Sequence, residues 1–122
     1  MRTLLLAAAL LAMPAQAADF MLLVQEAPAE LAKRTDQGPA GAAYWQGFVT
    51  AGGTLAQAGA LKGGGALEPT SAPGASGLIL GGYFIISASN LAAARDFAAR
   101  IAPQVRGGRI DVIAHAPTKT GM

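Results

Sequence analysis

His115 is the only histidine of this sequence, and histidine is the side chain most often used for proton transfer near neutral pH, so it is the first candidate for that role. The run RIDVIAH at residues 109–115 alternates as a strand does, which places His115 on one face with Ile113 and Asp111. If this face lines a cleft between subunits, His115 could act as a general base. Asp111 would not orient it directly, because two residues of a strand span about 6.5 Å. The alternative, which we favour, is a histidine at the solvent-exposed end of the strand.

Tyr44 and Trp45 are the second candidate, since adjacent aromatic side chains can stack on a flat ligand. Aromatic residues at helical spacing more often belong to a hydrophobic core, and both interpretations stay open. Together with Asp111, Ile113 and His115, the two aromatic residues make up the ligand cleft that the sequence predicts.

Other catalytic and cofactor-binding patterns are missing from the sequence. The glycine runs at residues 63–65 and 77–82 lack the Lys-Ser/Thr ending of a phosphate-binding loop, and no serine nucleophile elbow or paired-carboxylate spacing occurs. With one histidine and no cysteine, no metal site is expected within one chain, and no cofactor is predicted. The lack of cysteine also excludes disulfides and a lipoprotein anchor.

Residues 1–17 have the pattern of a secretory signal peptide. Arg2 gives a positive start, residues 4–13 are apolar, and the small-x-small sequence AQA ends at Ala17. A membrane-spanning helix needs about 20 apolar residues, which this run does not reach. We therefore expect cleavage after Ala17, export to the periplasm or medium, and a mature domain at residues 18–122 with no membrane span.

Nucleic-acid binding is not expected from the charges. Without Arg2 the chain keeps eight basic and seven acidic side chains, a net charge of about +1. A nucleic-acid site would need a clustered basic stripe. The arginines near the C-terminus are instead spaced among apolar residues, at Arg95, Arg100, Arg106 and Arg109. We interpret them as a solvated rim.

Hydrophobic periodicity divides the mature chain into six elements. Their order is strand, helix, strand, strand, helix, strand, over residues 20–25, 41–60, 61–69, 79–87, 91–101 and 109–115. The polar stretch after the first strand, with Glu30 and Asp36, is expected to be a solvated loop. Gly81 and Gly82 suit a place where another backbone or a bulky ring approaches closely.

The helix at 91–101 has a suitable N-cap in Ser89 or Asn90. The first and third strands are apolar on both faces, as in the run FMLLVQ at residues 20–25. Two helices can cover only one face of a four-stranded sheet. We therefore expect a second copy of the chain to cover the other face, because an exposed apolar sheet of this size would be an interaction site.

Four blocks of the sequence carry a family resemblance: DFMLLVQEAP, AYWQGFVTAGGTLAQAGALKGGGALEP, LGGYFIISASNLAAARDFAARI and GRIDVIAHAP. Together they span residues 19–117 and resemble the YCII-related domain family, specifically its DGPF branch. The resemblance implies a ferredoxin-like βαββαβ fold, an α+β sandwich that pairs as a dimeric α/β barrel.

The sequence departs from this family in two places. The Asp-Gly-Pro-Phe tetrapeptide that names the branch is missing. Smaller members of the family carry a histidine near the start of the first helix, whereas this sequence has no histidine there and has Tyr44 and Trp45 in that region. No catalytic residue of the family can be carried over, which favours a non-catalytic exported dimeric module with a cleft for a small, largely apolar ligand. The alternative, by analogy with dimeric barrels, is a lyase or isomerase acting on a small unsaturated acid or lactone.

Overall fold

A computed structural model describes residues 17–69, 72–106 and 108–116. The signal peptide predicted at residues 1–17 therefore lies outside the described residues, except for Ala17. Within the described part of the chain, no helix has the length and apolar character needed to cross a membrane.

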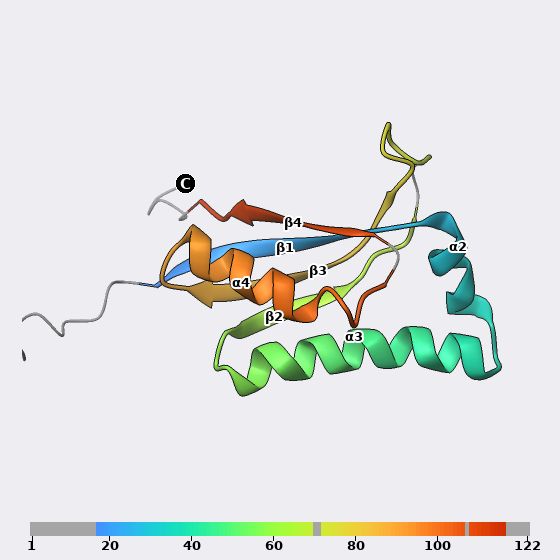
Figure 1. The fold of residues 1–122 in the computed structure, drawn as a ribbon, viewed down its shortest axis with the longest axis horizontal. Coiled ribbons are helices and arrows are strands. Elements are labelled where there is room, and N and C mark those ends of the chain that lie inside the picture. The colour runs from blue at the N-terminus through green and yellow to red at the C-terminus, as the bar shows by residue number, and fades with distance from the viewer. Residues whose placement is uncertain (1–16, 70–71, 107, 117–122) are drawn as a thin grey trace, which may run out of the picture.

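Four strands form one antiparallel sheet in the order β2-β3-β1-β4 (Figure 1). The elements follow the chain as β1 (Ala18–Glu26), α2 (Pro28–Leu31), the 3₁₀ turn η1 (Ala32–Thr35), α3 (Pro39–Gln57), β2 (Leu61–Ala66), β3 (Ile79–Ala88), α4 (Leu91–Ile101) and β4 (Arg109–Ala114). This mixed α+β arrangement is consistent with the ferredoxin-like order that the sequence predicts. The prediction of a solvated loop after the first strand is wrong for Glu30, which lies in the short helix α2.

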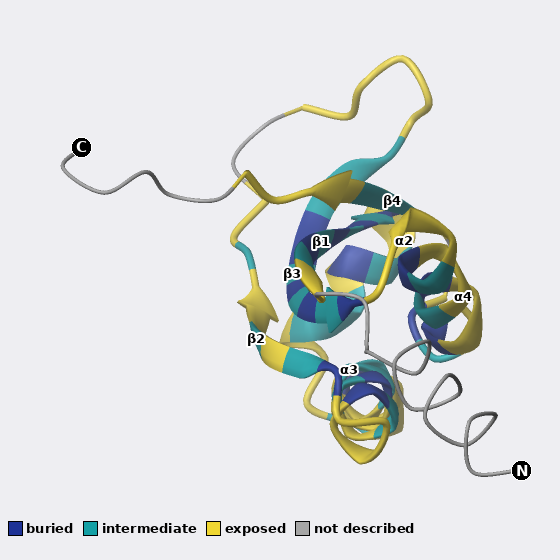
Figure 2. Ribbon diagram, turned by 90° about the vertical axis from the view of Figure 1, so that its left-hand side faces the viewer, coloured by how far each residue is buried: buried dark blue, intermediate teal, exposed yellow. Residues whose placement is uncertain are grey.

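Strand alternation places the hydrophobic core between the sheet and the two long helices (Figure 2). In β1, Phe20, Leu22 and Val24 face the helices and are buried. Leu22 pairs with Phe84 of β3 on one side and with Val112 of β4 on the other, so these side chains share the covered face.

Helix α3 is unbroken despite its internal glycines, and its ends follow from local chemistry. Pro39 occupies the first turn, where its missing N–H costs no hydrogen bond. Gly59 adopts a φ of 73° just after the helix, and the N–H of Ala60 donates to the Leu55 carbonyl at 3.0 Å. This Schellman ending explains why the helix stops before residue 60, where periodicity placed its end.

The predicted close approach at the glycine pair of β3 is confirmed. A Cβ atom on Gly82 would lie 2.9 Å from the ring of Phe48, and one on Gly81 would lie 1.8 Å from a carboxylate oxygen of Glu26. The absence of side chains there lets α3 and Glu26 pack directly against β3.

Helix α4 begins as the sequence predicts. The side chain of Asn90 accepts a hydrogen bond from the N–H of Ala93 at 2.8 Å, which identifies Asn90 as the N-cap. Ala94, Ala98 and Ile101 then form the buried face of the helix.

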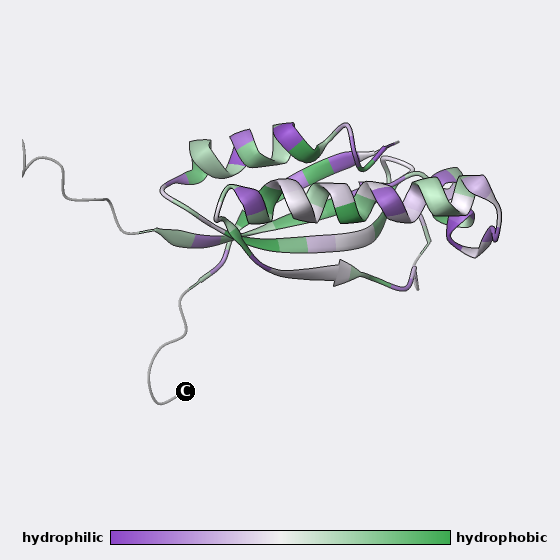
Figure 3. Ribbon diagram, turned by 90° about the horizontal axis from the view of Figure 1, so that it is seen from below, coloured by the Kyte–Doolittle hydropathy of each residue, from purple (hydrophilic) through white to green (hydrophobic). Residues whose placement is uncertain are grey.

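The second face of the sheet lies opposite the helices and has a group of apolar side chains at its centre. Met21 and Leu23 of β1 project to this face with Tyr83 and Ile85 of β3, their register partners. Ile113 of β4 pairs with Met21 and is 49% exposed. Helices α3 and α4 lie together on the other side of the sheet (Figure 3). We call this surface the open face, defined by these five residues.

Candidate functional site

Glu26, the last residue of β1, is an acidic side chain at a core position. It continues the alternation of Phe20, Leu22 and Val24 and is only 1% exposed. Burying a carboxyl group without hydrogen-bonding partners would be strongly unfavourable. Its surroundings must therefore supply donors.

Tyr44 and Arg34 supply these donors. The Tyr44 hydroxyl donates to Oε1 of Glu26 at 2.7 Å, and Nη2 of Arg34 lies 3.4 Å from Oε2. Nε of Arg34 also donates to the Tyr44 hydroxyl oxygen at 2.7 Å. Nη1 of Arg34 donates to the backbone carbonyl of Leu67 at 2.6 Å, and Nη2 donates to the backbone carbonyl of Gly81. Among the described residues, no buried side-chain nitrogen or oxygen lacks a partner.

The segment between β1 and α3 brings these groups together. Pro28 begins α2, and η1 then places Arg34 over the end of the sheet. The N–H of Gly38 donates to the Asp36 side chain at 2.6 Å in the turn that leads into α3, whose second turn carries Tyr44. The Arg34 guanidinium lies 5.3 Å from the centre of the Tyr44 ring, a favourable cation–π distance.

Burial dominates the electrostatics of this cluster. It raises the pKa of Glu26 above 4.5, although the Tyr44 hydroxyl and the Arg34 guanidinium oppose the shift. Burial and the neighbouring Glu26 carboxylate also raise the pKa of Tyr44, so Tyr44 stays protonated at neutral pH. Tyr44 therefore acts as the hydrogen-bond donor to Glu26.

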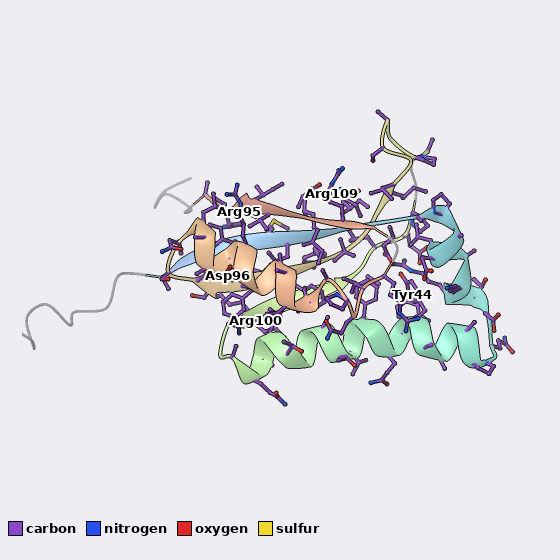
Figure 4. All side chains as sticks on the ribbon, viewed as in Figure 1. Tyr44, Arg95, Asp96, Arg100 and Arg109 are labelled. Atoms are coloured by element: carbon purple, nitrogen blue, oxygen red, sulfur yellow. The ribbon has the colours of Figure 1, made fainter. Side chains whose placement is uncertain are left out.

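A pocket of about 250 Å³ opens beside the cluster, between α2, α3 and the segment after α4. Figure 4 shows Tyr44 where α3 passes the end of the sheet, away from Arg109 on β4. The polar residues that line the pocket are Glu26, Glu30, Lys33, Tyr44, Gln104 and Arg106. A Cβ atom on Gly47 would lie 2.2 Å from the Gln104 carbonyl oxygen, so α3 and the segment after α4 approach closely at this wall.

The structure does not gather the five residues of the predicted cleft. Tyr44 lines the pocket, and Trp45 is 41% exposed beside it on α3. Asp111 and Ile113 lie on the opposite side of the sheet, since their register partners in β1 belong to the open face. His115 follows β4 as an exposed residue whose N–H donates to the Asp19 carbonyl at 2.9 Å.

The residues missed from the sequence are Glu26 and Arg34. Alternation could have revealed Glu26, because it is in phase with the buried residues of β1, but the strand was expected to end at residue 25. Arg34 had no comparable signal, since its position depends on how the chain turns through α2 and η1.

The site offers acid–base and hydrogen-bonding groups rather than metal ligands. Within the described ranges, no three His, Asp or Glu side chains come together in a way that could hold a metal ion. No model of a protein family matches this chain, and no curated protein is similar to it in sequence.

Proposed function

We propose that this chain is an exported, non-catalytic binding module, related to the DGPF branch of the YCII-related family. In this proposal two copies pair through their sheets as a dimeric α/β barrel, and each copy holds a small ligand in the pocket beside Glu26. The observation that carries the proposal is the open face, where apolar side chains of three strands lie side by side and no helix of the described residues covers them.

The size of the open face suits a dimer. The whole sheet on which it lies has four strands of six to ten residues. At about 3.3 Å per residue and about 4.8 Å between strands, the face measures roughly 500 Å² in projection. Side-chain relief makes the accessible surface larger than this projection, and typical stable interfaces bury about 800 Å² per partner. The face is therefore large enough only if the partner covers nearly all of it, as a second sheet would.

The charges around the open face favour a second copy over a charged partner. Lys62 pairs with Asp19 at 3.0 Å in one part of the sheet, and Arg109 pairs with Asp111 at 2.8 Å in another. These charges neutralise one another within each protomer. Two identical faces can therefore meet without like-charge repulsion, and the apolar centre supplies the attraction.

Replacing Ile85 tests the dimer directly. Wild-type protein should sediment as a dimer at micromolar concentration, whereas Ile85→Glu should sediment as a protomer because it buries a charge in the interface. Val49→Glu is the matched control, since Val49 is 66% exposed on α3, away from the open face. A wild-type protomer at this concentration, or dissociation by the control alone, would overturn the proposal.

One observation favours a second function, a lyase or isomerase acting on a small unsaturated acid or lactone. Glu26 borders a pocket and has a raised pKa, as a general acid or base requires. Both of its oxygens already face donors, which supports the non-catalytic proposal. Turnover of such an acid or lactone that is lost in Glu26→Gln and kept in His115→Ala would establish the enzyme instead.

Export is tested separately from assembly. Mass spectrometry of protein recovered from the periplasm should show a chain that begins at Ala18, as expected from the AQA sequence that ends at Ala17. Recovery of the intact N-terminus from the cytoplasm alone would contradict this part of the proposal.

A further inference from the structure

The volume of the pocket beside Glu26 limits its ligand to a small molecule. Water in the liquid occupies about 30 Å³ per molecule. The pocket volume of about 250 Å³ therefore corresponds to a ligand of roughly eight to ten non-hydrogen atoms.

The walls of the pocket divide into an apolar part and a charged part. Ala40, Ala43, Phe48 and Val105 supply the apolar part, which suits a flat or branched hydrocarbon body. The charged part consists of Glu26, Glu30, Lys33 and Arg106.

The four charged residues of the lining cancel in sign, and Arg34, which pairs with the lining residue Glu26, adds one positive charge that favours an anion. Lys33 pairs with Glu30 at 2.8 Å, and Arg34, which does not line the pocket, pairs with Glu26 at 3.4 Å. Arg106 forms no ion pair with any residue that the structure describes, so its positive charge is not balanced within this part of the chain.

From these observations we propose that the pocket binds a small organic acid in its anionic form, with its carboxylate at Arg106 and its apolar body against Phe48 and Ala43. The inference rests on the ligand-binding part of the proposed function and does not depend on the dimer. Such an acid balances the positive charge of Arg106 and packs its hydrocarbon part against the apolar wall.

Benzoate is a suitable probe, with benzamide and benzylamine as neutral and cationic molecules of similar shape. In an NMR titration of the mature chain at low salt, benzoate should bind with a Kd of about 1 mM or tighter. It should bind at least about tenfold more tightly than either analogue. No saturable benzoate binding, or equal binding of benzylamine, would overturn the inference.

Two variants locate the bound acid, and one matched control accompanies them. Arg106→Gln should weaken benzoate binding about tenfold or more, whereas Arg109→Gln, on β4 across the sheet, should leave it unchanged. Ala43→Phe should abolish binding by filling the pocket, and its exposed position lets the variant fold. Equal effects of the two arginine variants would show that only net charge matters and would refute the site.

The same titration in Ile85→Glu separates this inference from the dimer. Benzoate binding that persists in the protomeric variant supports a pocket built within one chain. If the wild type proves to be a protomer and still binds benzoate as described, the dimer fails and the ligand class stands.

Discussion

At the scale of single residues, Glu26 links the chemistry of the pocket to the stability of the fold. Burial raises its pKa above 4.5 against the opposing effects of Tyr44 and Arg34. The folded chain therefore keeps this proton to a higher pH than the unfolded chain. The wild type consequently loses stability as the pH rises from about 4.5 through the folded-state pKa.

Glu26→Gln removes this titration. As the pH rises through this range, the free energy of unfolding of the wild type should fall relative to that of the variant. Above the range, the difference between the two proteins should be constant. Urea unfolding at pH values from about 4 to 8 measures the difference, and other carboxyl groups cancel because both proteins carry them. Parallel curves for the two proteins would contradict a raised pKa at Glu26.

Gly81 tests how tightly the buried cluster is packed. A Cβ atom there would lie 1.8 Å from Oε2 of Glu26, and the carboxylate cannot retreat without breaking its bonds to Tyr44 and Arg34. We expect Gly81→Ala to lower the free energy of unfolding by about 1–3 kcal/mol. The matched control is Gly53→Ala in α3, where a Cβ atom would have no neighbour within 4 Å.

The control should have the opposite sign. Alanine in a helix is favoured over glycine by up to about 1 kcal/mol, so Gly53→Ala should be neutral or stabilising. Chemical unfolding of both variants decides the question. If Gly81→Ala were as stable as the wild type, the carboxyl group would have to lie elsewhere.

At the scale of elements, α4 depends on its N-cap more than on packing at its exposed first turn. The Asn90 side chain satisfies the N–H of Ala93 at 2.8 Å, and Leu91 is 39% exposed. Asn90→Ala should therefore cost about 1 kcal/mol in urea unfolding, whereas Ser89→Ala, one residue earlier, should cost almost nothing. A larger loss for Ser89→Ala would show that the cap is assigned to the wrong residue.

The elements could be predicted because their signals are local. Alternation located the strands, and Asn90 was one of the two caps expected for α4. The end of α3 was less clear, since Ala60 is apolar and only the conformation of Gly59 stops the helix before it.

The pocket could not be predicted from periodicity in the same way. It depends on the turn through α2 and η1, four residues each, which are too short to show a helical repeat. Tyr44 was recognised as a candidate because aromatic residues stand out in the sequence. Its partner Glu26 was not, because a carboxyl group at an apolar position is explained only by donors that arrive from other elements.

At the scale of the whole molecule, the sheet separates two surfaces that have different tasks in our proposal. The pocket uses the helix side, through Glu26 and Tyr44, and the dimer uses the open face, through Ile85 and Met21. Met21 and Glu26 of β1 thus contribute to opposite surfaces, since side chains alternate between the two faces along a strand. No side chain is shared between the two sites.

This separation predicts that assembly and ligand binding contribute independently to stability. The Tm of the wild type should rise with protein concentration, because only the folded chain dimerises, and the Tm of Ile85→Glu should not. Saturating benzoate should stabilise both proteins by the same free energy, within about 0.5 kcal/mol, as expected for distant sites without common partners. The pocket variant Ala43→Phe should show the reverse pattern, with a Tm that depends on concentration and no response to benzoate. A benzoate effect that vanishes together with the dimer would mean that the second copy completes the pocket, and the two surfaces would then have to be treated as one site.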